Sequence, residues 1–123
     1  MIGYVTLGTN DMERAAKFYD ALLALLGAKR TWESERYVAW GTAPTDPMLF
    51  VIKPYDGNRA TPGNGAMVSL AAGTKALVDA VYKKAVELGG KDEGPAGPRG
   101  DDFYAGYFRD LDGNKLAVYH MPL

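Results

Sequence analysis

Two segments of the chain carry apolar residues at the three- and four-residue spacing of an amphipathic helix. In the first, the spacing starts at Met12 and continues through Ala15, Ala16, Tyr19, Leu22, Leu23 and Leu26. Asn10 followed by Glu13 is typical of a helix N-cap with its capping-box acid, and Gly27 is typical of a helix end. We therefore predict a helix between Asn10 and Gly27, preceded by a strand over residues 2–7.

The second helical pattern also follows a β-rich segment. Thr74 has the side chain of an N-cap, Gly89 and Gly90 end the pattern, and the apolar stripe consists of Leu77, Val78, Val81, Tyr82, Ala85 and Leu88. Residues 91–102 are rich in glycine, proline and charge, which favours an irregular strand and a mobile loop. Short β-rich segments bounded by turn residues predict further strands at residues 30–33, 36–40, 48–53, 66–71, 103–109 and 115–121.

These elements occur in the same order twice because the sequence contains an internal repeat. The segment YVTL at residues 4–7 returns as MVSL at residues 67–70, an offset of 63 that also relates Tyr19 to Tyr82. A chain of 123 residues has the size of one ordinary domain. We therefore predict one domain made of two strand–helix–three-strand modules, with module 1 at about 1–54, a connector at about 55–64 and module 2 at about 65–123.

Composition and charge exclude several classes of partner. Fourteen Lys and Arg against fifteen Asp and Glu give a net charge of −1, which lacks the basic excess of proteins that bind nucleic acid or anionic membranes. The sequence has no apolar stretch of transmembrane length, and residues 1–14 show no basic segment followed by an apolar run. We expect no nucleic-acid partner, no membrane partner and a cytoplasmic location.

The supply of reactive side chains is small. The chain has no cysteine and a single histidine, His120, so disulfides, thiolate metal sites, a cysteine nucleophile and a three-histidine metal site are excluded within one chain. Alternation along the last strand puts His120 on the core side with Leu116 and Val118, which favours a structural role over that of a general base. Glycine-rich nucleotide-binding motifs and the serine-hydrolase GxSxG motif are also missing.

Three motifs placed on this doubled module carry a family resemblance. A strand ends at Gly8-Thr9-Asn10-Asp11, the first helix contains Phe18-Tyr19, and the last hairpin turns through Asp110-Leu111-Asp112-Gly113-Asn114, a DxDGN turn. Together with the repeat, they resemble the vicinal oxygen chelate superfamily, which includes glyoxalase I, bleomycin- and fosfomycin-resistance proteins and extradiol dioxygenases. The resemblance implies an α+β fold in which two βαβββ modules form an eight-stranded, cup-shaped incomplete barrel with the helices outside. It also implies a homodimer.

The resemblance further implies a divalent metal held by inward-facing strand residues. The matching positions in this sequence are Tyr4, Met67 and Ala117, with Phe50 as the repeat mate of Ala117. A divalent ion of this kind requires carboxylate or imidazole ligands, which a phenol, a thioether, a methyl and a phenyl group do not replace. We therefore expect no metal site and no cofactor.

Strand alternation defines a cup-facing set that can bind a ligand. The expected ligand-binding residues are Tyr4, Thr6, Phe50, Met67, Ser69, Ala117 and Tyr119, while Val5, Leu7, Leu49, Val51, Val68, Leu70, Leu116 and Val118 face the helices. An aromatic and methionine-rich set with two hydroxyls suits an apolar or aromatic small molecule. The alternative is that these side chains simply fill the cup.

Three hypotheses for function follow. The first is metal-independent binding or sequestration of an apolar or aromatic small molecule in the cup. The second is a lyase, isomerase or dioxygenase of this superfamily, acting through atypical metal ligands or through metal-free acid–base groups such as Tyr4 or Asp102. The third is an interaction module without a ligand. No catalytic residue is assigned, and the sequence does not identify the ligand.

Several further residues have two interpretations. Arg109 can meet an anionic ligand or pair with Asp110, and the sequence does not decide between them. The acids Asp101 and Asp102 are better explained as solvated loop charges than as site residues. The DxDGN turn lacks the spacing of a calcium loop and is explained by turn chemistry. Second-rank candidates for the cup walls are Tyr37, Trp40, Tyr104 and Tyr107.

Overall fold

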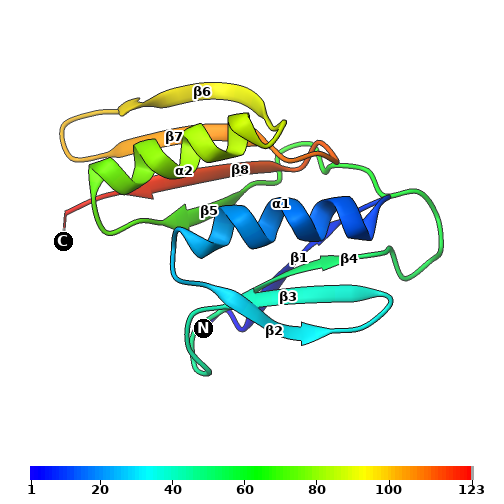
Figure 1. Ribbon diagram of the computed structural model, residues 1–123. Coiled ribbons are helices and arrows are strands. Elements are labelled where there is room, and N and C mark those ends of the chain that lie inside the picture. The colour runs from blue at the N-terminus through cyan, green and yellow to red at the C-terminus, as the bar shows by residue number, and fades with distance from the viewer. Residues whose placement is uncertain (123) are drawn as a thin grey trace.

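The computed structural model describes residues 1–122 and contains two copies of one arrangement, each a strand, a helix and three more strands (Figure 1). The first copy consists of β1 (Tyr4–Gly8), α1 (Met12–Ala24), β2 (Lys29–Glu33), β3 (Tyr37–Gly41) and β4 (Met48–Ile52). The second consists of β5 (Val68–Ala71), α2 (Lys75–Glu87), β6 (Lys91–Pro98), β7 (Tyr104–Arg109) and β8 (Lys115–His120). The predicted order of elements is confirmed.

Each module forms its own four-stranded sheet, with the order β1-β4-β3-β2 in the first and β5-β8-β7-β6 in the second. The first strand of each module pairs parallel to the last, and the other neighbours are antiparallel. The registers match as well, since Thr6 lies opposite Phe50 in one sheet and Ser69 opposite Ala117 in the other. The α+β fold of two βαβββ modules with unclosed sheets is therefore confirmed.

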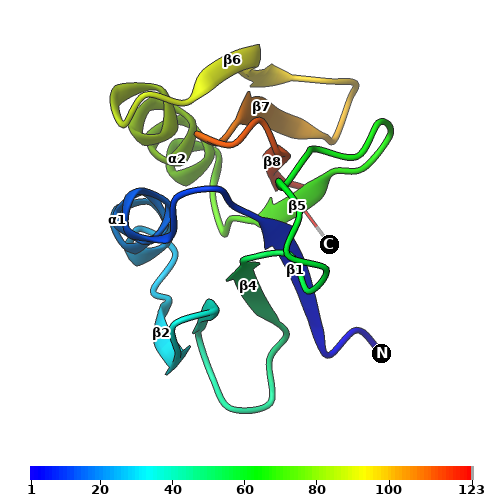
Figure 2. The ribbon, with the colours of Figure 1, turned by 90° about the vertical axis from the view of Figure 1, so that its right-hand side faces the viewer.

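Both helices lie side by side on one side of the two sheets, as Figure 2 shows on its left. The amino-terminal segment and the linking segment between β4 and β5 lie on the opposite side. One continuous apolar core fills the space under the helices, and it takes side chains from both modules, among them Leu22, Val51, Val81, Phe108 and Leu116. The modules therefore share one core.

The first helix begins one residue later than the N-cap predicted at Asn10. Asp11 has the extended backbone of an N-cap, and its side chain accepts a hydrogen bond from the backbone N–H of Arg14 at 3.1 Å. The Asn10 side chain instead accepts from the N–H of Ala60 at 2.8 Å and donates to its carbonyl at 3.0 Å. Asn10 was the wrong N-cap because its amide is used to hold the linking segment.

The second helix is capped as predicted, by the Thr74 hydroxyl, which accepts from the N–H of Leu77. Its end requires Gly90, because a Cβ there would lie 2.7 Å from the Ala85 carbonyl oxygen and 2.8 Å from that of Arg109. The glycine lets the chain cross directly from the helix into β6. Within residues 1–122, no helix has the length and apolar character needed to cross a membrane.

Strand pairing places the two tryptophans of the first sheet on opposite sides, Trp40 through its pairing with Leu49 of β4 and Trp32 through a bulge in β2. Arg30 pairs with Trp40, but after the bulge Trp32 pairs with Ala39, so the two tryptophans lie on opposite sides. Trp40 is buried beneath α1, with its indole N–H donating to Asp20 at 2.9 Å. Trp40 was therefore a wrong candidate for a cup wall, since the helix covers it.

The tyrosines of the second rank also divide between the two sides. Tyr104 belongs to the helix side, because its hydroxyl donates to Asp79 of α2 at 2.6 Å. Tyr107 lies opposite Ala117 and Tyr37 lies 5.5 Å, ring to ring, from Phe50, so both face away from the helices. Alternation alone could not make this assignment for strands with small residues on both faces.

The DxDGN turn closes the hairpin of β7 and β8 and also joins the two modules. The buried Asp110 carboxylate accepts from the Tyr19 hydroxyl at 2.5 Å and from the Asn114 side-chain amide at 2.9 Å. The same amide donates to the carbonyl of Gly8 at 2.9 Å, and Thr9 donates to Asp112 at 2.6 Å. The expected turn chemistry is present, and it connects module 2 to the end of β1.

Burial, followed by the Asp110 carboxylate, raises the pKa of Tyr19 well above 10. The Tyr19 phenol therefore stays protonated and remains a hydrogen-bond donor at neutral pH. Its contribution to stability is fully present below the unfolded-state pKa near 10 and is lost as the pH rises through the folded-state pKa. The hydroxyl acts as a fixed part of the junction.

Candidate functional site

The side of the two sheets opposite the helices, called here the exposed face, carries all seven residues predicted to bind a ligand. In module 1 these are Tyr4 and Thr6 on β1 and Phe50 on β4. The Tyr4 ring lies 4.9 Å from the Phe50 ring, and Tyr37 of β3 extends the row on the other side. Tyr4 is 60% exposed and the Phe50 and Tyr37 rings are half-buried, so this aromatic row is partly open to solvent.

The module 2 part of the exposed face is less uniform. Met67 is 46% exposed and Ser69 is exposed, whereas Ala117 is almost fully buried and offers at most a methyl group. Tyr119 is half-buried and stacks on Phe103 with 5.5 Å between ring centroids. The structure therefore places the predicted residues in two groups, one on each sheet. The group in module 1 is mainly aromatic, whereas the group in module 2 mixes exposed and buried side chains.

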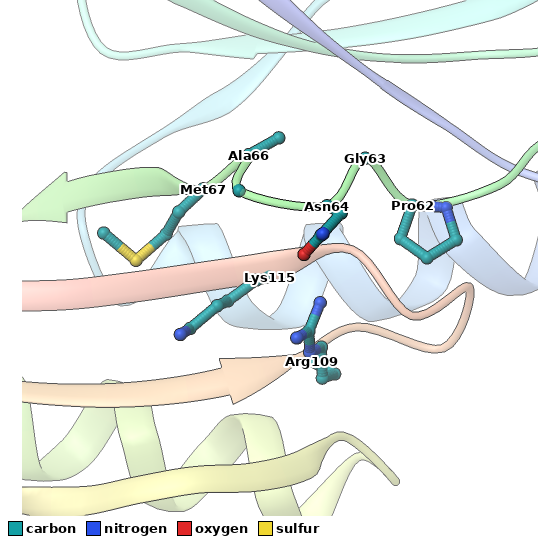
Figure 3. A pocket seen from close by; sticks show the side chains of 8 residues that line it. Pro62, Gly63, Asn64, Ala66, Met67, Arg109 and Lys115 are labelled. Atoms are coloured by element: carbon teal, nitrogen blue, oxygen red, sulfur yellow. The ribbon is translucent and has the colours of Figure 1, made fainter.

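A first cavity of about 620 Å³ lies where the linking segment passes over the start of β8, and we call it the connector cavity (Figure 3). Of the predicted ligand-binding residues, only Met67 lines it. The other residues lining it are Pro62, Gly63, Asn64, Gly65, Ala66, Arg109 and Lys115. Sequence reasoning missed Asn64 and Lys115, although alternation from Tyr119 through Ala117 already places Lys115 on the exposed face.

A second cavity of about 540 Å³ lies between the modules, near the carboxyl end of α1. Met67 and Ser69 line it together with core residues such as Leu23, Leu49 and Leu70. Tyr4, Thr6, Phe50, Ala117 and Tyr119 line neither of these two cavities. These five residues therefore lie on the exposed face outside both cavities; Tyr4 and Thr6 are exposed there, Phe50 and Tyr119 are half-buried and Ala117 is buried.

Arg109 does not pair with Asp110. Its Nε donates to the Glu93 carboxylate at 2.5 Å, and its Nη1 donates to the carbonyl of Gly113 at 3.1 Å. The hydrogen bond from Arg109 lowers the pKa of Glu93 below its ordinary value, so this carboxyl is ionised at neutral pH. Asp110 is instead occupied by the junction between the modules.

The four positions where the resemblance implies a metal do not fit one. Tyr4, Met67, Ala117 and Phe50 provide no carboxylate or imidazole, and neither metal nor water is needed to satisfy a buried side chain near them. Among residues 1–122, no three His, Cys, Asp or Glu side chains lie close enough together to hold a metal ion. The donor chemistry of the exposed face therefore supports binding through rings, hydroxyls and sulfur.

His120 lies on the helix side, as alternation predicts. A ring nitrogen, Nδ1, lies 3.0 Å from the carbonyl oxygen of Ala72, so the imidazole links the end of β8 to the end of β5. This contact agrees with a structural role. The acids Asp101 and Asp102 are exposed in the loop between β6 and β7.

A family model described as the glyoxalase/bleomycin resistance protein/dioxygenase superfamily matches residues 1–118. The chain belongs to this superfamily. The resemblance drawn from the repeat and the DxDGN turn is thereby confirmed. Superfamily membership establishes the fold and leaves the chemistry of this chain to its own residues.

Several solved structures match the chain over nearly its whole length. A glyoxalase/bleomycin resistance protein from Albidiferax ferrireducens T118 is 36% identical, with 99% of both chains covered and a TM-score of 0.90. The hypothetical protein SA1046 from S. aureus is 25% identical, with 98% of this chain and 92% of that chain covered and a TM-score of 0.74. A lactoylglutathione lyase from Agrobacterium tumefaciens, at 23% identity, 98% and 92% coverage and a TM-score of 0.70, shares the fold. No curated protein matches the sequence.

Proposed function

We propose that this superfamily member binds an apolar or aromatic small molecule on its exposed face, without a metal ion. The observation that carries the proposal is the row of Tyr4, Phe50 and Tyr37 rings on the side away from the helices, where Tyr4 is 60% exposed and the other two rings are half-buried. Contiguous apolar surface of this kind, rimmed by polar residues, marks interaction sites in soluble proteins. Nothing within the module explains its exposure, since the helices already cover the opposite side of the sheet.

The chemistry of the face defines the class of ligand. Offset or edge-on aromatic pairs contribute about 0.5–1.5 kcal/mol beyond area burial, and methionine sulfur adds favourable contacts with rings. The hydroxyls of Thr6 and Ser69 lie on the same face and can orient a polar substituent. A flat aromatic molecule with one or two hydrogen-bonding groups meets all of these requirements.

The proposal includes a homodimer in the cytoplasm. A ligand lying on an open sheet face would be covered on one side only, whereas ligand sites generally bury about 70–90% of a drug-sized molecule. A second copy of the chain would supply the missing cover. Sedimentation of the purified protein tests this part, with a dimer expected and a monomer at micromolar concentration contradicting it.

The binding surface is tested with uncharged aromatic amides: benzamide, 1-naphthamide and indole-3-carboxamide. At least one should raise the melting temperature of the wild-type protein, because a ligand that binds only the folded state stabilises it. The double variant Tyr4→Ala with Met67→Ala should weaken that binding by about tenfold or more, since it removes a ring and a thioether from the surface.

The matched control for this experiment is Tyr55→Ala, which removes a tyrosine that is 91% exposed and lies outside the proposed surface. Tyr55→Ala should bind like the wild type. Unchanged affinity in the Tyr4 and Met67 double variant would reject the assigned surface. Failure of all three amides to bind the wild type would reject the proposed class of ligand.

A further inference from the structure

The connector cavity is lined by two cationic side chains that play no part in the proposed aromatic surface. Arg109 and Lys115 are direct cross-strand partners at the start of the β7–β8 hairpin, and both line the cavity. Figure 3 shows the Asn64 side chain pointing from the linking segment toward these two cationic side chains. Like charges that face each other across two strands are unfavourable unless an anion lies between or beside them.

The acid of β6 that faces this cluster, Glu93, is already used. Glu93 receives the Arg109 hydrogen bond, and Lys91, which pairs with Arg109 across the strands, and Lys115 lie near the same carboxylate. Three cations therefore share one carboxylate. Within the described part of the chain, Lys115 forms neither an ion pair nor a hydrogen bond, and its Nζ lies over the Tyr107 ring, 5.7 Å from the centroid.

Lys115 is also partly buried, and because it shares Glu93 with two other cations its charge is only partly balanced, which costs more there than at a fully exposed lysine. A bound anion would remove this cost and would receive a hydrogen bond from an ammonium group held in place by the hairpin. Asn64 provides a neutral amide on the opposite wall, so the cavity offers donors from the connector and from β8. The cavity therefore matches the oxygens of a carboxylate or phosphate.

We propose that the connector cavity binds the anionic group of an organic acid, with Lys115 supplying the charge and Asn64 a hydrogen bond. Met67 lines this cavity and is itself an exposed residue of the exposed face, so the apolar body of the same molecule can continue from the cavity along that face. The preferred ligand is then an aromatic carboxylate or phosphate. The position of the apolar body rests on the proposed function, whereas anion binding in the cavity does not.

The preference for an anion is measured with matched pairs of probes: benzoate against benzamide and 1-naphthoate against 1-naphthamide, at constant ionic strength. The wild type should bind the carboxylate about tenfold more tightly than the amide, because one charge-assisted hydrogen bond is gained. Lys115→Met should abolish this difference, while Lys115→Arg should retain most of it. Equal affinity for the two members of each pair in the wild type would overturn the proposal.

The control Lys83→Met removes the same charge from an exposed position on α2, which packs on the other side of the sheet, and should leave the preference unchanged. A preference lost equally in Lys83→Met and Lys115→Met would show a general effect of net charge and would also overturn the proposal.

A second measurement is independent of any aromatic body. Inorganic phosphate and acetate, titrated against chloride at equal ionic strength, should shift the backbone amide signals of residues 64–67, 109 and 115 in an NMR spectrum. The anion that binds more tightly shows whether the cavity prefers a phosphate or a carboxylate group. Lys115→Met should remove the shifts. Localised shifts without any binding of the aromatic amides would support the cavity and reject the proposed function. Binding of the aromatic amides without localised anion shifts would support the proposed function and reject the anion site in the cavity.

Discussion

Replacing Asp110 with alanine is expected to lower the free energy of unfolding by about 3–4 kcal/mol. The carboxylate is buried and accepts four hydrogen bonds: from the Tyr19 hydroxyl, from the Asn114 side-chain amide, and from the backbone N–H groups of Asp112 and Asn114. The variant would remove the acceptor of all four hydrogen bonds and leave the Asn114 side-chain amide only its bond to the Gly8 carbonyl. It would also release the side chain that holds Asn114 against β1.

Urea denaturation at pH 7 measures this effect, and Tyr19→Phe provides a graded comparison. Phenylalanine keeps the ring packed between Phe18 and Trp40 and removes one of the four hydrogen bonds, so a loss of about 1 kcal/mol is expected. Asp79→Asn, at an exposed hydrogen bond to Tyr104, should change stability by less than about 0.5 kcal/mol. A loss below 1 kcal/mol for Asp110→Ala would contradict the assigned role of the turn.

The second large effect concerns the two tryptophans of the chain, which lie on the neighbouring strands β2 and β3 and face opposite sides of the sheet. Trp40→Ala should cost about 3–5 kcal/mol, because it opens a cavity beneath α1 and leaves Asp20 without one of its donors. Trp32→Ala should change stability by less than about 0.5 kcal/mol, since Trp32 is 58% exposed. Thermal and urea denaturation of both variants measure the difference.

This pair tests the β2 bulge directly. Without the bulge, Trp32 would lie on the same side of the sheet as Trp40, because Arg30 pairs with Trp40 and Trp32 is two residues further along β2. Similar destabilisation by both substitutions would therefore show that the register is wrong. Trp40→Phe, which keeps an aromatic ring in the core, should lose less stability than Trp40→Ala.

Much of the fold could be predicted from the sequence because its signals are local. The repeat at residues 4–7 and 67–70 fixes two modules, and the three- and four-residue spacing fixes both helices. Alternation also assigned the core side correctly, since Leu49, Val51 and Leu116 are all buried. These patterns depend only on residues that lie close together in the chain, so they can be recognised without knowing the tertiary structure.

The errors arise where a distant contact decides between two local choices. Asn10 and Asp11 are both good N-caps, and Asp11 takes the role because Asn10 binds the linking segment fifty residues away. Trp40 was misplaced because the small Ala39 beside it makes both faces of the strand plausible, and its pairing with Leu49 of β4 is what puts it on the core side. Neither outcome has a signal within the segment concerned.

In the candidate site, too, the local features could be predicted from the sequence and the features that depend on distant contacts could not. Alternation placed Tyr4 and Phe50 on one face, and their rings lie in contact distance. The connector cavity could not be predicted, because it exists only where the linking segment crosses the hairpin of β7 and β8. The partner of Arg109 is likewise a residue of a neighbouring strand, Glu93, instead of the adjacent Asp110.

The most direct test of the central claim is an NMR titration of the untagged protein with 1-naphthamide, carried out with and without a chelator such as EDTA. Binding on the exposed face without a metal predicts shifts at Tyr4, Thr6, Phe50 and Met67 and the same affinity in both samples. Loss of binding on chelation, restored by a stoichiometric divalent metal, would contradict the account. Shifts confined to α1 and α2 would contradict it as well.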